Sequence, residues 1–165
     1  MKHNYSIPFL LTCIVFTTSF GQPSVREQKT VGGRYLDYLE SISFTKDGGL
    51  IAGGSSASNI SGEKTQNSRG GKDYWIVKLD RFNKIQWDKT IGGNEDDFLR
   101  SVQQTTDGGY ILGGYSYSNI SAEKTQNSMN IDYWVVKLDS LGNVQWDKTI
   151  LISRNSDQQS NVQVE

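Results

Sequence analysis

Residues 73–91 (DYWIVKLDRFNKIQWDKTI) and residues 132–150 (DYWVVKLDSLGNVQWDKTI) are nearly the same sequence. In each stretch, two runs of apolar, β-branched and aromatic residues are separated by a short polar segment, which is typical of a β-hairpin. Both alternating sets of positions in the first run are apolar, so we expect both faces of that strand to be covered. Such a strand needs a neighbouring layer on each side.

The duplication extends towards the N-terminus. Residues 29–68 align with residues 89–128 without a gap, and one residue is lost in the loop that follows. Self-similarity with a period of about 60 residues is the signature of a tandem structural repeat. We therefore divide the chain into a first unit with an N-terminal lead-in, residues 22–88, and a second unit, residues 89–150.

The sequence of each unit predicts four short antiparallel strands. In the second unit we expect them near residues 98–105, 110–116, 133–138 and 144–149. The motif Asp107-Gly108-Gly109 predicts a tight hairpin, and no segment keeps the 3.6-residue apolar period of a helix. The sequence therefore predicts an all-β fold of tandem four-stranded antiparallel blade-like repeats, a partial, two-unit β-propeller. The alternative is a two-sheet β-sandwich.

The first 21 residues have the pattern of a secretory signal peptide. A basic start, Met1-Lys2, precedes an uncharged apolar run over residues 7–20. That run is shorter than the roughly 20 residues that a helix needs to cross a bilayer. We expect a protein that is secreted or held at the outer cell surface, with no membrane span after cleavage. An uncleaved anchor and a lipoprotein acylated at Cys13 are alternatives, although this cysteine lies inside the apolar run rather than after it.

Removal of the signal peptide takes away His3 and Cys13, the only histidine and the only cysteine of the chain. The remaining protein then has no Ser-His-Asp or Cys-His catalytic unit, no disulfide and no zinc site built from thiolates or imidazoles. The net charge of −1 gives no electrostatic basis for binding nucleic acid. We expect no enzyme activity and no cofactor.

The two hairpin stretches resemble the repeats of secreted β-propeller-like proteins of Bacteroidetes-type bacteria. The resemblance covers most of the chain after the signal peptide, and it implies an outer-surface or released protein. Longer relatives often carry a C-terminal sorting domain for type IX secretion, for which this sequence shows no counterpart. The repeats are also similar, more loosely, to the blades of quinoprotein-like propellers. These resemblances imply a fold and not an activity.

The repeat pattern stops after Ile150, where the expected Gly-Gly is replaced by Leu151-Ile152. We expect residues 151–165 to be a polar, disordered tail. Propellers close with about four to eight blades, so two units do not make a ring. We interpret the chain as a truncated form of a longer propeller protein; assembly from several chains and an open pair of sheets are alternatives. Uncovered apolar faces also predict self-association.

Residues that recur at the same place in both units are explained by the scaffold. We expect the recurring tryptophans to lie in the core: Trp75, Trp87, Trp134 and Trp146. The recurring acidic residues could form the carboxylate pair of a glycoside hydrolase, but their repetition favours hydrogen bonding within loops. They are Glu63, Glu123, Asp73 and Asp132.

Two acidic segments are candidates for calcium. Residues 94–97 (NEDD) supply clustered oxygens that have no counterpart in the first unit, and residues 139–143 (DSLGN) faintly resemble a calcium loop. A solvated loop for the first segment and a hairpin turn for the second are the preferred explanations. We therefore assign no metal ligand.

Tyr115 and Tyr117 are the candidate ligand-binding residues, because they replace Ser55 and Ala57 of the first unit. Two tyrosines on the same side of a strand can form a platform for a glycan or a peptide, although packing against a neighbouring unit explains them too. The expected function is a non-catalytic module for adhesion, recognition or scaffolding that binds a protein or a glycan. The alternatives are a glycan-binding module and a part of a propeller enzyme whose active residues lie on missing blades.

Overall fold

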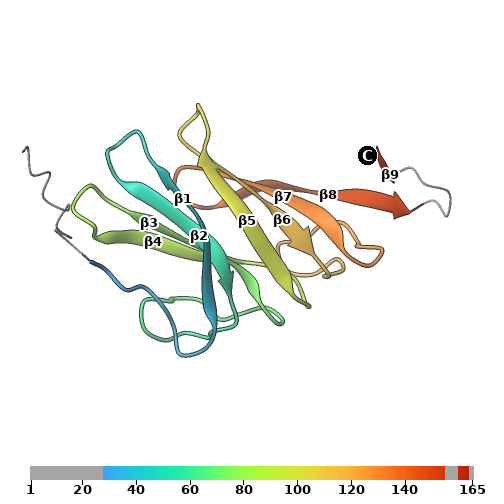
Figure 1. Cartoon of the computed structure of the whole chain (residues 1–165), viewed down its shortest axis with the longest axis horizontal. Helices are drawn as coiled ribbons and strands as arrows, with labels where there is room; N and C mark the ends of the chain where they lie inside the picture. Colours follow the sequence, from blue (N-terminus) through green and yellow to red (C-terminus); the bar gives the residue numbers. More distant parts are fainter. Residues whose placement is uncertain (1–27, 155–159, 164–165) are drawn as a thin grey trace, which may run out of the picture.

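The computed structural model describes residues 28–154 and 160–163, so the expected signal peptide lies outside the described residues. The described chain is all-β, as the sequence predicts. Its strands form two antiparallel sheets in chain order (Figure 1). The first sheet contains β1 (Asp37–Phe44), β2 (Leu50–Ser56), β3 (Asp73–Leu79) and β4 (Ile85–Ile91). The second contains β5 (Asp97–Gln104), β6 (Tyr110–Ser116), β7 (Asp132–Leu138), β8 (Val144–Arg154) and β9 (Ser160–Gln163).

Hairpin turns join β1 to β2, β3 to β4, β5 to β6 and β7 to β8, and those of the second unit lie at the predicted places. Gly48 and Gly108 have φ angles of 80° and 85°, which glycine adopts without steric cost. In both turns the preceding aspartate bonds the backbone: Asp47 Oδ1 accepts from Gly49 N at 3.1 Å, and Asp107 Oδ1 accepts from Gly109 N at 3.0 Å. Local turn chemistry therefore sets the register of β1 with β2 and of β5 with β6.

The C-terminal segment differs from the disordered tail that we expect from its polar composition. β8 continues past the end of the repeat to Arg154 and pairs with β9, from Leu151 opposite Gln163 to Arg154 opposite Ser160. The apolar pair Leu151-Ile152 that replaces Gly-Gly prolongs the strand, because β-branched and apolar residues favour extended backbone whereas glycine favours a turn.

Each sheet has two distinct faces, which we name from the third strand of the unit. The leading face carries Trp75, Val77 and Leu79 in the first unit and Trp134, Val136 and Leu138 in the second. The trailing face carries Tyr74 and Ile76 in the first unit and Tyr133 and Val135 in the second. Strand pairing extends each face across its sheet, since residues directly opposite in register share a face.

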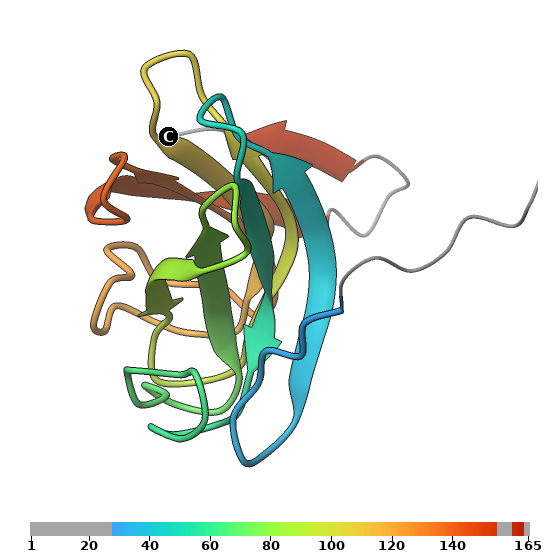
Figure 2. The same cartoon turned by 90° about the vertical axis from the view of Figure 1, so that its left-hand side faces the viewer.

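The trailing face of the first sheet packs on the leading face of the second (Figures 1 and 2). Tyr74 lies against Trp134 with ring centroids 4.9 Å apart, and its hydroxyl donates to the Trp134 carbonyl at 3.1 Å. β5 is the strand of the second sheet that contacts β1, β2 and β3. The sheets thus stack in the same orientation, each burying a different face, as successive members of a repeat do.

The prediction that both faces of the third strand are covered is right for the first unit and wrong for the second. Tyr74 and Ile76 are fully buried, whereas Tyr133 is 51% exposed. Trp146, which we expect in the core, is 48% exposed, although its counterpart Trp87 packs against the core. The cause is shared: among the described residues, no third sheet covers the trailing face of the second unit.

Candidate functional site

The leading face of the first sheet is only partly covered: its β3 residues are buried, whereas Leu39, Ile42 and Phe44 of β1 are exposed. Its counterpart in the second unit is sealed, with Leu99 fully buried, whereas the equivalent Leu39 is 64% exposed. A cavity of about 490 Å³ lies on this face and is lined by Leu39, Ile42, Leu50, Ala52, Trp75 and Val77, among others. Contiguous exposed apolar surface on a protein of this size commonly marks an interaction site.

The lead-in crosses one edge of this face. Val31 packs against the buried cluster of Trp75, Val77 and Leu79. The following residues are fixed to the first unit, because Gly32 N donates to the Glu63 carboxylate at 3.1 Å and Gly33 N donates to Asp37 at 2.6 Å. The lead-in therefore covers part of the leading face and leaves the rest open.

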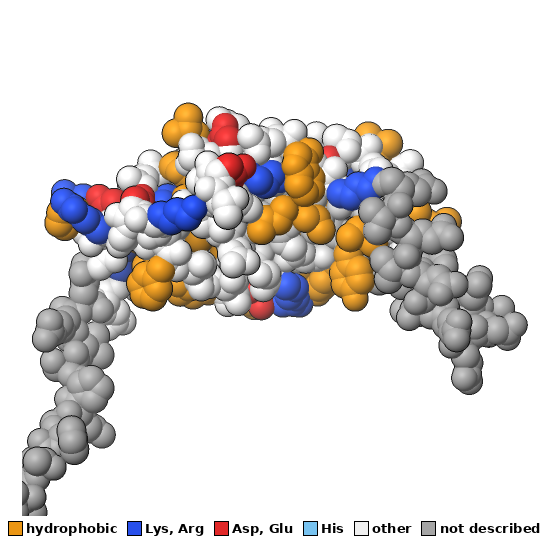
Figure 3. All heavy atoms as spheres, turned by 90° about the horizontal axis from the view of Figure 1, so that it is seen from above, with side chains coloured by type: hydrophobic (Ala, Val, Ile, Leu, Met, Phe, Trp, Pro, Cys, Tyr) orange, Lys and Arg blue, Asp and Glu red, His pale blue; other side chains and the backbone are white. Residues whose placement is uncertain are grey.

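The trailing face of the second sheet is the other open surface, at the opposite end of the stack. It carries the exposed Tyr133 and Trp146 together with the half-buried Val135 and Ile150. Hydrophobic side chains are visible between charged ones on the surface in Figure 3. The two open faces are thus of opposite kind, one leading and one trailing.

An aromatic cluster on the open trailing face contains Phe98 and Tyr115, which lie in register with Tyr133, and extends to Tyr117. Tyr115 stacks on Phe98 with ring centroids 5.0 Å apart, and Tyr117 meets both rings edge-on at 6.3 and 6.4 Å. Arg100 lies over the Tyr115 ring at 5.1 Å and donates to its hydroxyl at 2.8 Å. The structure therefore brings the candidate residues together.

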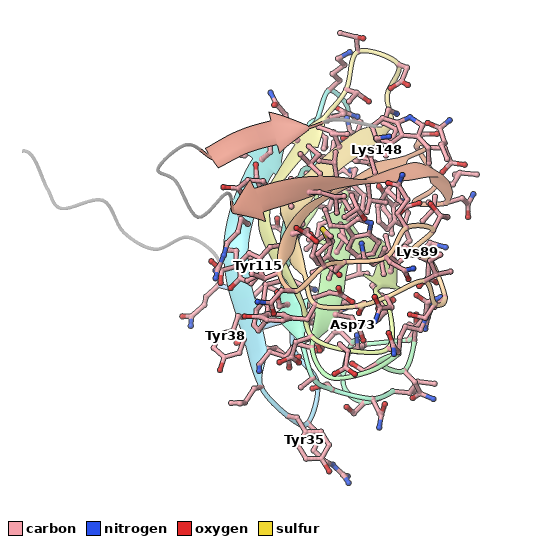
Figure 4. The ribbon with its side chains drawn as sticks, turned by 90° about the vertical axis from the view of Figure 1, so that its right-hand side faces the viewer. Tyr35, Tyr38, Asp73, Lys89, Tyr115 and Lys148 are labelled. Carbon is pink, nitrogen blue, oxygen red and sulfur yellow. The ribbon has the colours of Figure 1, made fainter. Side chains whose placement is uncertain are left out.

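Phe98 and Arg100 belong to this cluster, but the sequence analysis misses them. They replace Tyr38 and Glu40 of the first unit. The difference between units that points to Tyr115 also marks Arg100, so a systematic comparison of the two copies would find it. Figure 4 shows Tyr115 on the same side of the molecule as Tyr38, away from Lys89 and Lys148.

The sequence analysis also misses a pair of buried lysines. Lys64 and Lys124 are almost fully buried in the long loops after β2 and β6, each with its ammonium 5.4 Å from a tryptophan ring centroid. Lys64 Nζ donates to Thr90 Oγ1 at 2.5 Å. Burial lowers the pKa of Lys64 to about 8, while the nearby Asp73 and Asp88 act in the opposite direction. Because the arrangement recurs in both units, we assign it to the scaffold.

The recurring carboxylates hold loops and junctions in place. Glu123 forms an ion pair with Arg69 of the first unit at 2.7 Å. The equivalent residue of the first unit, Glu63, accepts a hydrogen bond from Gly32 N of the lead-in. Asp73 is buried at the start of β3 and accepts from Arg69 N at 2.7 Å. Asp132, at the equivalent place in β7, accepts from Met129 N at 2.8 Å. Each of these carboxylates therefore has a local structural partner.

The acidic segments proposed for calcium also contact the scaffold. Asp96 accepts from Lys72 N at 2.6 Å, and the buried Asp97 accepts from Gly93 N at 2.6 Å. Asp139 accepts from Leu141 N and Asn143 N within its hairpin, each at 2.8 Å. In the part of the chain that the structure describes, no three His, Cys, Asp or Glu side chains gather in a way that could hold a metal ion.

In comparisons with known proteins, no family model matches the chain, and no curated protein matches it. Over residues 28–154 and 160–163, no helix has the length and apolar character needed to cross a membrane.

Proposed function

We propose that this chain is a non-catalytic, exported repeat module that works by binding through its outer sheet faces. The observation that supports the proposal is the contrast between equivalent residues. Tyr74 is fully buried at the junction between the units, and the equivalent Tyr133 is half exposed on the outer face. A surface with the composition of an interface and no cover within the described chain is suited to adhesion, recognition or scaffolding.

A surface-retention assay tests this proposal. The purified chain is passed over an immobilised glycan array, over layers of unrelated proteins and over a layer of the chain itself. A face variant, Tyr133→Ser with Trp146→Ser, should lose retention on at least one surface that retains the wild type. Its melting temperature should change little, because both side chains are about half exposed.

Phe82→Ser is the control, because Phe82 is an exposed aromatic residue (65%) that lies in the turn between β3 and β4 and not on the face. It should be retained like the wild type. Equal retention of the face variant and the wild type, or no retention of the wild type on any layer, would contradict the proposed function.

Glycan binding is a second candidate function, and the cluster of Phe98, Tyr115 and Tyr117 favours it. Exposed aromatic rings stack on the apolar faces of sugars, and Arg100 supplies hydrogen-bond donors beside them. Tyr117→Ala should abolish retention on the glycan array if sugars bind here. Retention that survives this substitution would exclude the cluster as a glycan site.

A further inference from the structure

The two open faces of the chain are the two halves of a contact that the chain already makes once. A trailing face is buried against a leading face at the internal junction, while one leading face and one trailing face remain open. We propose that a second copy of the chain docks head to tail, with its leading face on the open trailing face of the first. The proposal rests on the proposed function and names the partner.

The clearest sign of this docking is a leucine side chain that packs over a glycine at the internal junction and has an unpacked counterpart on each open face. At the internal junction Leu99 is fully buried over Gly53, where a Cβ atom would lie 2.5 Å from Leu99 Cδ2. The equivalent Gly113 has no atom within 4 Å of its Cβ position, and the equivalent Leu39 is exposed. Repetition of the junction places Leu39 of one copy over Gly113 of the other.

When the chains dock in the register of the internal junction, opposite charges on the two open faces meet. Glu40 and Arg100 occupy equivalent positions of the two units and form an ion pair across the internal junction at 2.6 Å. In the docked pair, Arg100 meets Glu40 of the second copy. Successive junctions then build a row of alternating charges, which favours this register over one that places like charges together.

A second pair of facing positions differs between the internal junction and the open faces, and both members differ in the same way. Lys72 and Asp96 form an ion pair across the internal junction at 3.9 Å, and Lys72 N donates to Asp96 Oδ1 at 2.6 Å. The equivalent positions on the open faces are Ile131 and Leu36, so both members change from charged to apolar. A charge on one face opposite an apolar residue on the other would be unfavourable, and neither open face presents that mismatch.

Side-chain volumes also change in opposite directions on the two faces. The open trailing face has Tyr115 where the internal junction has Ser55, which accepts from Leu99 N at 3.0 Å. The open leading face has the smaller Ala52 and Leu50 where the second unit has Leu112 and Tyr110. At these positions, bulk that is added on the trailing face is removed from the leading face, and the 490 Å³ cavity lies beside Leu50 and Ala52. The Ser55 hydrogen bond has no direct counterpart in the docked pair.

Docking moves the lead-in. Val31 is equivalent to Ile91, which is buried in the internal junction, and Val31 packs on the leading face of the first sheet. In the docked pair, Ile150 of one copy takes the place of Val31 of the next. The lead-in thus covers the free end of a stack and is displaced where a second copy adds. Because the interface joins unlike faces, repeated docking gives a ring or a filament.

Sedimentation velocity over a range of concentrations tests the docking with Gly113→Val. The wild type should show concentration-dependent growth in mass, and the variant should associate at least about tenfold more weakly, because the added side chain fills the place of Leu39. Its melting temperature should not fall, since the site is open within one chain. A wild type that stays monomeric, or a variant that associates equally well, would overturn the proposal.

A complementation experiment tests the register. Ile131→Lys and Leu36→Asp should each weaken self-association at least about tenfold, because each places a charge opposite an apolar residue. A mixture of the two variants should recover association, since the introduced ammonium of one chain then meets the introduced carboxylate of the other, as Lys72 meets Asp96. Failure of the mixture to recover while both single variants remain folded would overturn this register.

These outcomes are distinguishable from failure of the proposed function. If the chain stays monomeric but is retained on glycans or other proteins through Tyr133 and Trp146, the second copy is excluded and the proposed function stands. If no layer retains the chain, both the proposed function and the docking of a second copy are wrong.

Discussion

The buried residue Asp73 makes the stability of the folded chain depend on pH. Desolvation raises the pKa of Asp73 to about 6 from the usual 3.8, against the hydrogen bond from Arg69 N and the charge of Lys64. Between these two values the unfolded chain loses its proton first, so the folded chain binds more protons. The free energy of unfolding should therefore fall as pH rises from about 4 to 6 and level off above 6, by at most about 3 kcal/mol from this residue.

Asp73→Asn tests this linkage. An amide keeps an oxygen that can accept from Arg69 N, and it has no charge to desolvate. The variant should show a smaller fall in stability between pH 4 and pH 6 than the wild type, as measured by urea unfolding at a series of pH values. The buried Asp97, whose pKa is also raised by desolvation, contributes a fall of its own in both proteins. An unchanged pH profile would show that Asp73 is not the group responsible.

Gly53 and Gly113 form a matched pair at the internal and the open trailing face. Gly53→Ala should destabilise the chain by about 1–3 kcal/mol, because the new methyl group meets Leu99 and Val102 in a packed junction. Gly113→Ala should be neutral or stabilise by up to about 1 kcal/mol, because it restricts the unfolded chain and meets no atom. Equal effects in chemical unfolding would contradict the assignment of the two faces.

Asp88 is one of the residues that tie the long loop after β2 to its sheet. Asp88 in β4 accepts from Trp75 Nε1 at 2.9 Å and from Thr65 N at 3.1 Å. Asp147 makes the same bonds in β8 but is only half buried. Asp88→Ala should cost about 2–4 kcal/mol, since it leaves buried donors unpaired, and Asp147→Ala should cost less. Thermal melting of both variants measures this, and a larger loss from Asp147→Ala would contradict it.

The strands and hairpins follow from local sequence, which is why they are predictable. Alternating apolar residues and Asp-Gly-Gly turns place β6 at the predicted residues and β5, β7 and β8 within a residue or so of their predicted starts. The exposure of Tyr133 and Trp146 is not a local property, because it depends on whether another sheet covers them. The same limit applies to the candidate site. Tyr115 and Tyr117 stand out by asymmetry, but their contact with Phe98 depends on strand pairing.

The two units together expose one leading and one trailing face, and this arrangement underlies both proposals. Each further unit should add one junction like that between the sheets, with its burial of Tyr74, Leu99 and Trp134. Stability in such stacks grows with the number of interfaces. The two-unit chain is therefore expected to be the least stable member of a series.

Urea unfolding of a three-unit chain tests this account most directly. A further copy of residues 32–91 inserted after Ile150 places the leading face of the first unit, with Glu40 and Leu36, on the open trailing face opposite Arg100 and Ile131. The sequence of residues 28–150 is kept, and only the pairing of β9 with the end of β8 is changed. We expect a higher free energy of unfolding and a steeper dependence on urea, because one more junction is buried. An unchanged free energy of unfolding, with Tyr133 and Trp146 still exposed, would show that the open faces are not the halves of a repeated junction.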